Sequence, residues 1–251
     1  MFLIGAILVI FALGIARRFS WAPAIKLDEA WERTRPKVFT YIRNSPATFA
    51  YLVVLSITTW VLLGSSDRVA RLLLLQDSTS LHQFRIDPIK VLIRSAFWAP
   101  GYEFLAWAIL FAVVLAPAER WLGTRRLVTV FASGHVLATL GAATALWLSI
   151  RYGWSSKILE NTVDVGVSYG FAAVAAIFTF RLPAKWRWWS AMTLVAIAVA
   201  ALFISQTFTD VGHLVALAIG FAFYPMTKDF ETRSRARYSV WSFSTLPDAK
   251  N

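Results

Sequence analysis

Six ionisable side chains and one serine stand within or beside long apolar stretches, and they are the residues whose chemistry the sequence singles out. Charged groups are costly inside membrane-spanning segments and are functional candidates by default. The group comprises Glu103, Glu119, His135, Asp164, Asp210, His213 and Ser168. Asp164 and Ser168 are four residues apart and Asp210 and His213 three, so each pair shares a helix face. The absence of cysteine excludes thiolate nucleophiles and cysteine-ligated metals.

Small residues surround the serine and follow the histidine. Gly166 and Gly170 flank Ser168, and Ala216 and Gly220 continue the pattern that begins at His213. Small residues at this spacing allow two helices to approach closely. A hydrogen bond between a serine and a histidine on neighbouring helices would require such an approach.

The elements that must position these residues are apolar helices. Apolar residues make up 58% of the chain, charged residues make up 16%, and the mean hydropathy is +0.59. Soluble domains carry roughly 25% charged residues, and a transmembrane helix needs about 20 apolar ones. The sequence therefore predicts an all-α, polytopic membrane protein. Its apolar runs are Phe2–Ile15, 48–65, 98–118, 126–150, 165–182, 188–206 and 208–226.

The runs divide the chain into three parts. Residues 1–47 are expected to hold a short N-terminal span, which a misassigned start codon could also produce, and a basic linker. Residues 48–226 form the membrane domain, and 227–251 form a charged tail. The segment 66–97 mixes apolar and basic residues, so we expect short helices in the membrane interface.

The distribution of lysine and arginine predicts the orientation of the spans. The formal net charge is +11, and alternating the spans places most basic residues, including those of the tail, on one face. That face is predicted to be cytoplasmic, in an inner or plasma membrane. The topology then puts Ser168 and His213 at similar depth near the outer ends of their spans. The charge fits an anionic lipid bilayer rather than nucleic acid.

Three motifs in this order resemble the rhomboid family of intramembrane serine proteases. They are APAERWLGTRRLVTVF (116–131), GVSYG (166–170) and GHLVALAIG (212–220). The resemblance implies a six-helix core over roughly 48–226, with the N-terminal span as an addition. It also implies that Ser168 on the fourth helix is the nucleophile and His213 on the sixth its general base, without a third, acidic member.

The sequence departs from the family pattern at two places. The family's H-x-x-x-x-H-x-x-x-N stretch aligns with 98–107, where this chain has Trp98, Glu103 and Trp107. The family's second histidine and its asparagine help to hold the oxyanion, and both are replaced. Tyr169 stands where the family has the glycine after the serine. An ionised Glu103 would repel an oxyanion, whereas a neutral one could donate the missing hydrogen bond; Glu103 or Asp210 could instead pair with His213.

Glu119 and His135 are expected to be structural. Glu119 could accept backbone N–H bonds in a tight turn that Gly123 permits, or pair with an arginine. His135 is expected to make a helix–helix hydrogen bond.

Three functions follow. The first is a protease that cuts single-span membrane substrates through Ser168 and His213. The second is an inactive rhomboid-fold pseudoprotease that binds transmembrane helices of client proteins and regulates their assembly. The third, a metal or proton site built from Glu103, Asp164, Asp210 and His213, has no H-E-x-x-H spacing behind it. We expect no metal and no cofactor. The dyad favours the first function, and the replaced oxyanion donors favour the second.

Overall fold

The computed structural model describes residues 22–99, 101–161, 167–205 and 207–228. The run Phe2–Ile15, Asp164, Gly166 and the tail from 229 lie outside the described residues. The chain forms two units. One holds the helix α2 (Ala22–Arg43), and the other begins at Ser45 and holds every later helix that the structure describes.

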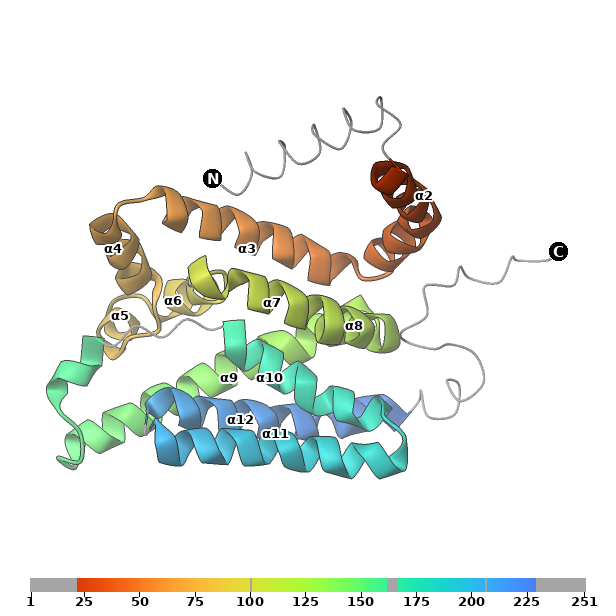
Figure 1. Ribbon diagram of the computed structural model, residues 1–251. Helices are drawn as coiled ribbons and strands as arrows, with labels where there is room; N and C mark the ends of the chain where they lie inside the picture. Colours follow the sequence, from red (N-terminus) through yellow and green to blue (C-terminus); the bar gives the residue numbers. More distant parts are fainter. Residues whose placement is uncertain (1–21, 100, 162–166, 206, 229–251) are drawn as a thin grey trace. The chain divides into compact units, whose positions relative to one another are not determined.

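The unit from Ser45 is built from apolar helices, as the sequence predicts (Figure 1). The first three long ones are α3 (Pro46–Gly64), a continuous helix over 104–122 and α9 (Thr124–Arg151). The helix over 104–122 consists of α7 (Phe104–Leu110), a π-helical turn (Phe111–Leu115) and α8 (Ala116–Leu122). A short 3₁₀ turn extends α10 (Val167–Phe178) to Arg181, and α11 (Ala184–Ile204) and α12 (Phe208–Ala222) follow.

Four of these helices are long and apolar enough to cross a membrane, namely α3, the helix over 104–122, α9 and α11. The apolar helices α10 and α12 are shorter. The described part of the chain contains no strand, which confirms the predicted all-α membrane fold. Six spans remain the expectation from the sequence.

Short helices occupy the segment 66–97, as expected: α4 (Asp67–Asp77), α5 (Leu81–Ile86) and α6 (Pro88–Ser95). Asp87 begins α6 by accepting a hydrogen bond from the Lys90 amide at 3.1 Å. His135 of α9, 3% exposed, holds this helix through its Nε2, which lies 2.7 Å from the Leu92 carbonyl oxygen. The histidine thus joins α9 to a short helix.

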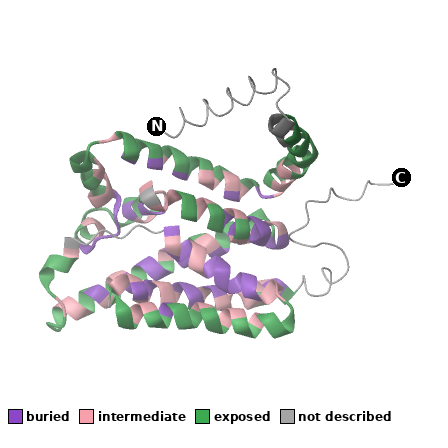
Figure 2. Ribbon diagram, in the orientation of Figure 1, coloured by how far each residue is buried: buried purple, intermediate pink, exposed green. Residues whose placement is uncertain are grey.

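Small residues bring the backbones of α9, α10 and α12 close together. A Cβ atom added at Gly220 would lie 2.1 Å from the carbonyl oxygen of Ala173, and one at Gly134 would lie 2.3 Å from the Ala173 Cβ. One at Gly170 would meet the Phe131 ring at 2.6 Å. Figure 2 shows the buried residues concentrated on these helices and on α8, whereas α11 and much of α3 are exposed.

A buried carboxylate ties α3 to the start of α9. Glu119, in α8, is 1% exposed. Its Oε1 accepts hydrogen bonds from the Ala47 amide at 2.9 Å and the Thr124 hydroxyl at 2.7 Å. Its Oε2 accepts from the amide and the hydroxyl of Thr48 at 2.8 and 2.7 Å. The first amides of a helix lack intrahelical partners, so the carboxylate supplies acceptors where α3 most needs them.

The chain around Glu119 is shaped to allow this contact. Ser45, which precedes α3, donates its hydroxyl to the Ala116 carbonyl at 3.0 Å. Gly123, with φ +83°, ends α8, and α9 begins at the next residue. That φ lies in the region that glycine adopts without steric cost. The backbone N–H donors to Glu119 come from α3, more than seventy residues earlier in the chain, and not from the turn at Gly123.

Replacing Glu119 with alanine is expected to lower the free energy of unfolding in detergent micelles by about 4 kcal/mol, because buried donors lose their acceptor at a cost of about 1–3 kcal/mol each. Glu119→Gln keeps one acceptor oxygen and should cost about half as much. As a control, Glu160→Ala removes a 3.4 Å pair with the exposed Arg85 and should cost less than about 0.5 kcal/mol. Equal losses in Glu119→Ala and Glu160→Ala would contradict this role.

Gly220→Ala should lower the free energy of unfolding by about 2 kcal/mol, because the new Cβ would press on backbone atoms that cannot yield locally. Gly64→Ala is the matched control: nothing lies within 4 Å of its added Cβ, so stability should change by less than about 1 kcal/mol. Circular dichroism during thermal unfolding measures both variants. Equal melting temperatures would refute the close packing of α10 and α12.

Candidate functional site

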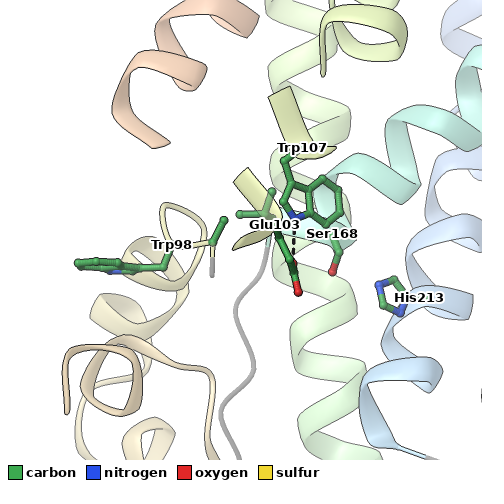
Figure 3. A pocket seen from close by; sticks show the side chains of 7 residues that line it. Trp98, Glu103, Trp107, Ser168 and His213 are labelled. Atoms are coloured by element: carbon green, nitrogen blue, oxygen red, sulfur yellow. Dashed lines mark hydrogen bonds between the residues drawn. The ribbon is translucent and has the colours of Figure 1, made fainter. Parts of the chain in front are cut away.

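A cavity of about 300 Å³ brings together Ser168, His213 and the residues where the sequence departs from the family pattern (Figure 3). The cavity is lined by Trp98, Ala99, Glu103, Trp107, Val167, Ser168 and His213. Three parts of the chain meet there: the segment 98–107, the beginning of α10, and α12. Sequence reasoning did not name Ala99 and Val167, whose small apolar side chains carry no chemical signal of their own.

The serine lies in the first turn of the described part of α10. Ser168 is partly buried, and its hydroxyl points into the space between the Glu103 carboxyl and the His213 ring (Figure 3). Gly170 lets this part of α10 pack against the Phe131 ring of α9. The serine is therefore placed by the packing of α10 on α9.

The histidine packs against the residue that replaces the family's glycine. The rings of Tyr169 and His213 lie edge to face with centroids 5.1 Å apart. Tyr169 is fully buried with Ala138, Ala142 and Ala216 and does not itself line the cavity. Gly212 makes room for it, since an added Cβ there would lie 2.5 Å from the tyrosine ring. The tyrosine thus supports the imidazole and leaves the cavity open.

A carboxylate and an indole lie at the positions where the resemblance predicts the family's oxyanion donors. The Trp107 Nε1–H donates a hydrogen bond to Glu103 Oε2 at 3.1 Å, the one hydrogen bond that Figure 3 marks among the residues drawn. Glu103 ends a short 3₁₀ turn (Gly101–Glu103), and Trp107 follows one turn later in α7. The Trp107 ring is held edge to face by Phe111 and Phe171, at 6.1 and 5.6 Å.

The segment before Glu103 is held by α3. The Thr58 hydroxyl donates to the Phe97 carbonyl at 2.8 Å, and the Tyr51 hydroxyl donates to the Ala96 carbonyl. Gly101 allows Leu63 to approach, because an added Cβ would lie 2.8 Å from a Leu63 methyl carbon. This wall of the cavity therefore depends on the position of α3.

Asp210 has a local role at the start of α12. Its Oδ2 accepts hydrogen bonds from the amide and the hydroxyl of Thr207, at 2.9 and 2.7 Å. The Asp210 amide in turn donates to the Thr207 carbonyl at 3.2 Å. Thr207 and Asp210 form a capping box, an arrangement that stabilises a helix N-terminus. Asp210 is 6% exposed and does not line the cavity.

The remaining acidic candidate, Asp164, lies outside the described residues, as does Gly166. Within the described ranges, no group of three or more histidine, aspartate or glutamate side chains is placed to hold a metal ion. The hypothesis of a metal or proton site built from Glu103, Asp164, Asp210 and His213 therefore gains no metal-site support from the members that the structure describes.

A family model described as rhomboid-like protein matches residues 40–233. The match spans α3 to α12 and contains Glu119, Ser168 and His213. No curated protein and no solved structure gave a match. Because the family model covers most of the sequence, the chain belongs to the rhomboid-like family of membrane proteins.

Proposed function

We propose that this protein is an intramembrane serine protease that cleaves single-span membrane proteins, with Ser168 as the nucleophile and His213 as the general base. One observation carries the proposal: the two side chains line the same cavity, and the serine hydroxyl points into the space between the Glu103 carboxyl and the His213 ring (Figure 3). A serine hydroxyl is a weak nucleophile until a base removes its proton, and an imidazole does this near neutral pH.

The proposed reaction follows from this pair. His213 takes the proton of Ser168 while Oγ forms a bond to the carbon of the substrate peptide carbonyl. The C–N bond then breaks, and the leaving amine receives the proton from His213. Water, deprotonated by His213, hydrolyses the ester and restores the serine. Tyr169, packed edge to face on the imidazole, keeps the ring in position through this cycle.

Glu103 decides how the oxyanion is stabilised in this proposal. The Trp107 N–H is donated to Glu103 Oε2, and Glu103 itself lines the cavity. A neutral carboxyl has one O–H to donate, and a donor aimed at the developing oxyanion is among the strongest contributions to catalysis. We propose that Glu103 supplies this donor when it is protonated.

The second candidate is a pseudoprotease that binds transmembrane helices of client proteins and controls their assembly. The observation that favours it is the Glu103–Trp107 hydrogen bond, since two residues at the oxyanion positions bind each other. With Glu103 ionised, the cavity would repel an oxyanion. It would still present Trp107 and Val167 as apolar contacts to a helix.

A serine-directed fluorophosphonate is expected to label the purified protein on Ser168. Labelling should disappear in Ser168→Ala and fall by about 10²-fold or more in His213→Ala, because the serine loses its base. Ser56→Ala, which removes an exposed hydroxyl bonded to the Leu52 carbonyl, is the matched control and should label like the wild type. Absence of labelling, with an active rhomboid labelled in parallel, would sink the protease proposal in favour of the pseudoprotease.

Glu103→Gln is expected to retain proteolysis, because the amide still donates a hydrogen bond. Glu103→Ala should lower kcat by about 10²–10³-fold, the cost of losing one oxyanion donor. Cleavage of a single-span substrate in proteoliposomes measures both. Full activity in Glu103→Ala would show that the carboxyl has no part in the reaction.

A further inference from the structure

The helix α2 lies almost entirely outside the residues that the family model matches, because the match begins at residue 40. The sequence predicts residues 1–47 as a short span and a linker, yet the structure has a 22-residue helix in this part of the chain. A helix of this length with charged residues along much of it cannot serve as a span. Its function therefore has to be inferred from the residues on its apolar and charged sides.

One face of α2 carries apolar and aromatic side chains at helical spacing. These residues, with Thr34 between them, are Ala30, Trp31, Val38, Tyr41 and Ile42. The side chains of Trp31 and Ile42 are 51% and 38% exposed. Tryptophan and tyrosine favour the boundary between headgroups and acyl chains, where a ring can be half apolar and half hydrated. We call these six residues the apolar stripe.

Three basic residues of α2 border the apolar stripe. At helical spacing Lys26 and Lys37 fall along one border of the stripe and Arg35 along the other, where Asp28 lies beside it. The acidic Glu29 and Glu32 fall on the side opposite the stripe, together with Arg43. Basic side chains at such a border can lay their carbon stems on apolar surroundings and extend their charges to phosphates, while the acidic groups stay in water.

The ion pairs within α2 would not prevent its basic side chains from binding lipid phosphates. Arg33 and Glu29 lie 4.0 Å apart and Arg35 and Glu32 lie 3.6 Å apart, with all four side chains more than half exposed. Pairs of this kind contribute little to stability. Lipid phosphates could therefore replace the carboxylates as partners of Arg35 at small cost.

Chain connectivity decides which partner the stripe meets. α2 ends at Arg43 and α3, a candidate membrane span, begins at Pro46. The C-terminal end of α2 is thereby tethered within two intervening residues of a bilayer surface. We propose that α2 lies in the plane of that surface as an interfacial helix, with the apolar stripe at the acyl boundary and Lys26, Arg35 and Lys37 on the phosphates of anionic lipids.

The absence of cysteine allows the full-length protein to be labelled at single sites. Thr34→Cys and Thr40→Cys give a matched pair, since Thr34 lies in the apolar stripe and Thr40 on the polar side. Each variant, spin-labelled, is placed in nanodiscs of phosphatidylcholine with or without phosphatidylglycerol. We then measure how often the spin label collides with oxygen, which partitions into lipid, and with a nickel chelate, which stays in water.

With phosphatidylglycerol, the label at 34 should collide more with oxygen and the label at 40 more with nickel, and the contrast should shrink in phosphatidylcholine alone. Replacing Lys26, Arg35 and Lys37 by glutamine should lower the ratio of inserted to solvated α2 about fivefold per residue. Replacing Asp28, Glu29 and Glu32 by their amides should preserve it. Equal nickel collisions at both sites, protection of site 34 from both agents, or equal contrast in both lipids would overturn the proposal.

Discussion

The position of the site depends on the hydrogen bonds that the first amides of α3 donate to Glu119. Its two oxygens join the beginning of α3, the end of α8 and the beginning of α9. Through Thr58 and Tyr51, α3 then holds the backbone at 96–97, which leads into the cavity wall. A carboxylate remote from the chemistry thereby positions Glu103. Since buried donors without an acceptor are costly, loss of this carboxylate would loosen the wall before it changed any reacting group.

The opposite wall is fixed by packing rather than by hydrogen bonds. Gly220 and Gly134 let α12 and α9 approach Ala173 of α10, and this approach brings Ser168 and His213 to one cavity. Tyr169 depends on the same approach, because only a glycine at 212 leaves room for its ring. Tyr169, which replaces the family's glycine, and Gly212, beside His213, therefore pack as a matched pair. The tyrosine fills the space between helices and supports the imidazole.

Periodic and local features of the structure could be predicted from the sequence, and partnerships between distant residues could not. The apolar runs predict the helices of the main unit to within a few residues except at the start of α7, and the segment 66–97 does hold short helices. The partners of Glu119 and the contact of Tyr169 with Gly212 arise from tertiary packing, which leaves no local pattern. The Trp107–Glu103 hydrogen bond could have been predicted from the sequence, because a donor and an acceptor one helical turn apart meet on one face. The helix α2 was missed because its charges of both signs hide the apolar stripe.

The two candidate functions share one geometry, and in our proposal the proton on Glu103 distinguishes them. In either case Ser168, His213 and Glu103 line one cavity of about 300 Å³. A protonated Glu103 turns the carboxyl at the oxyanion position from a repulsive group into a donor, and an ionised one leaves a binding site that cannot stabilise the tetrahedral intermediate. The Trp107 N–H bonds to either form, so it holds the side chain in place without selecting between them.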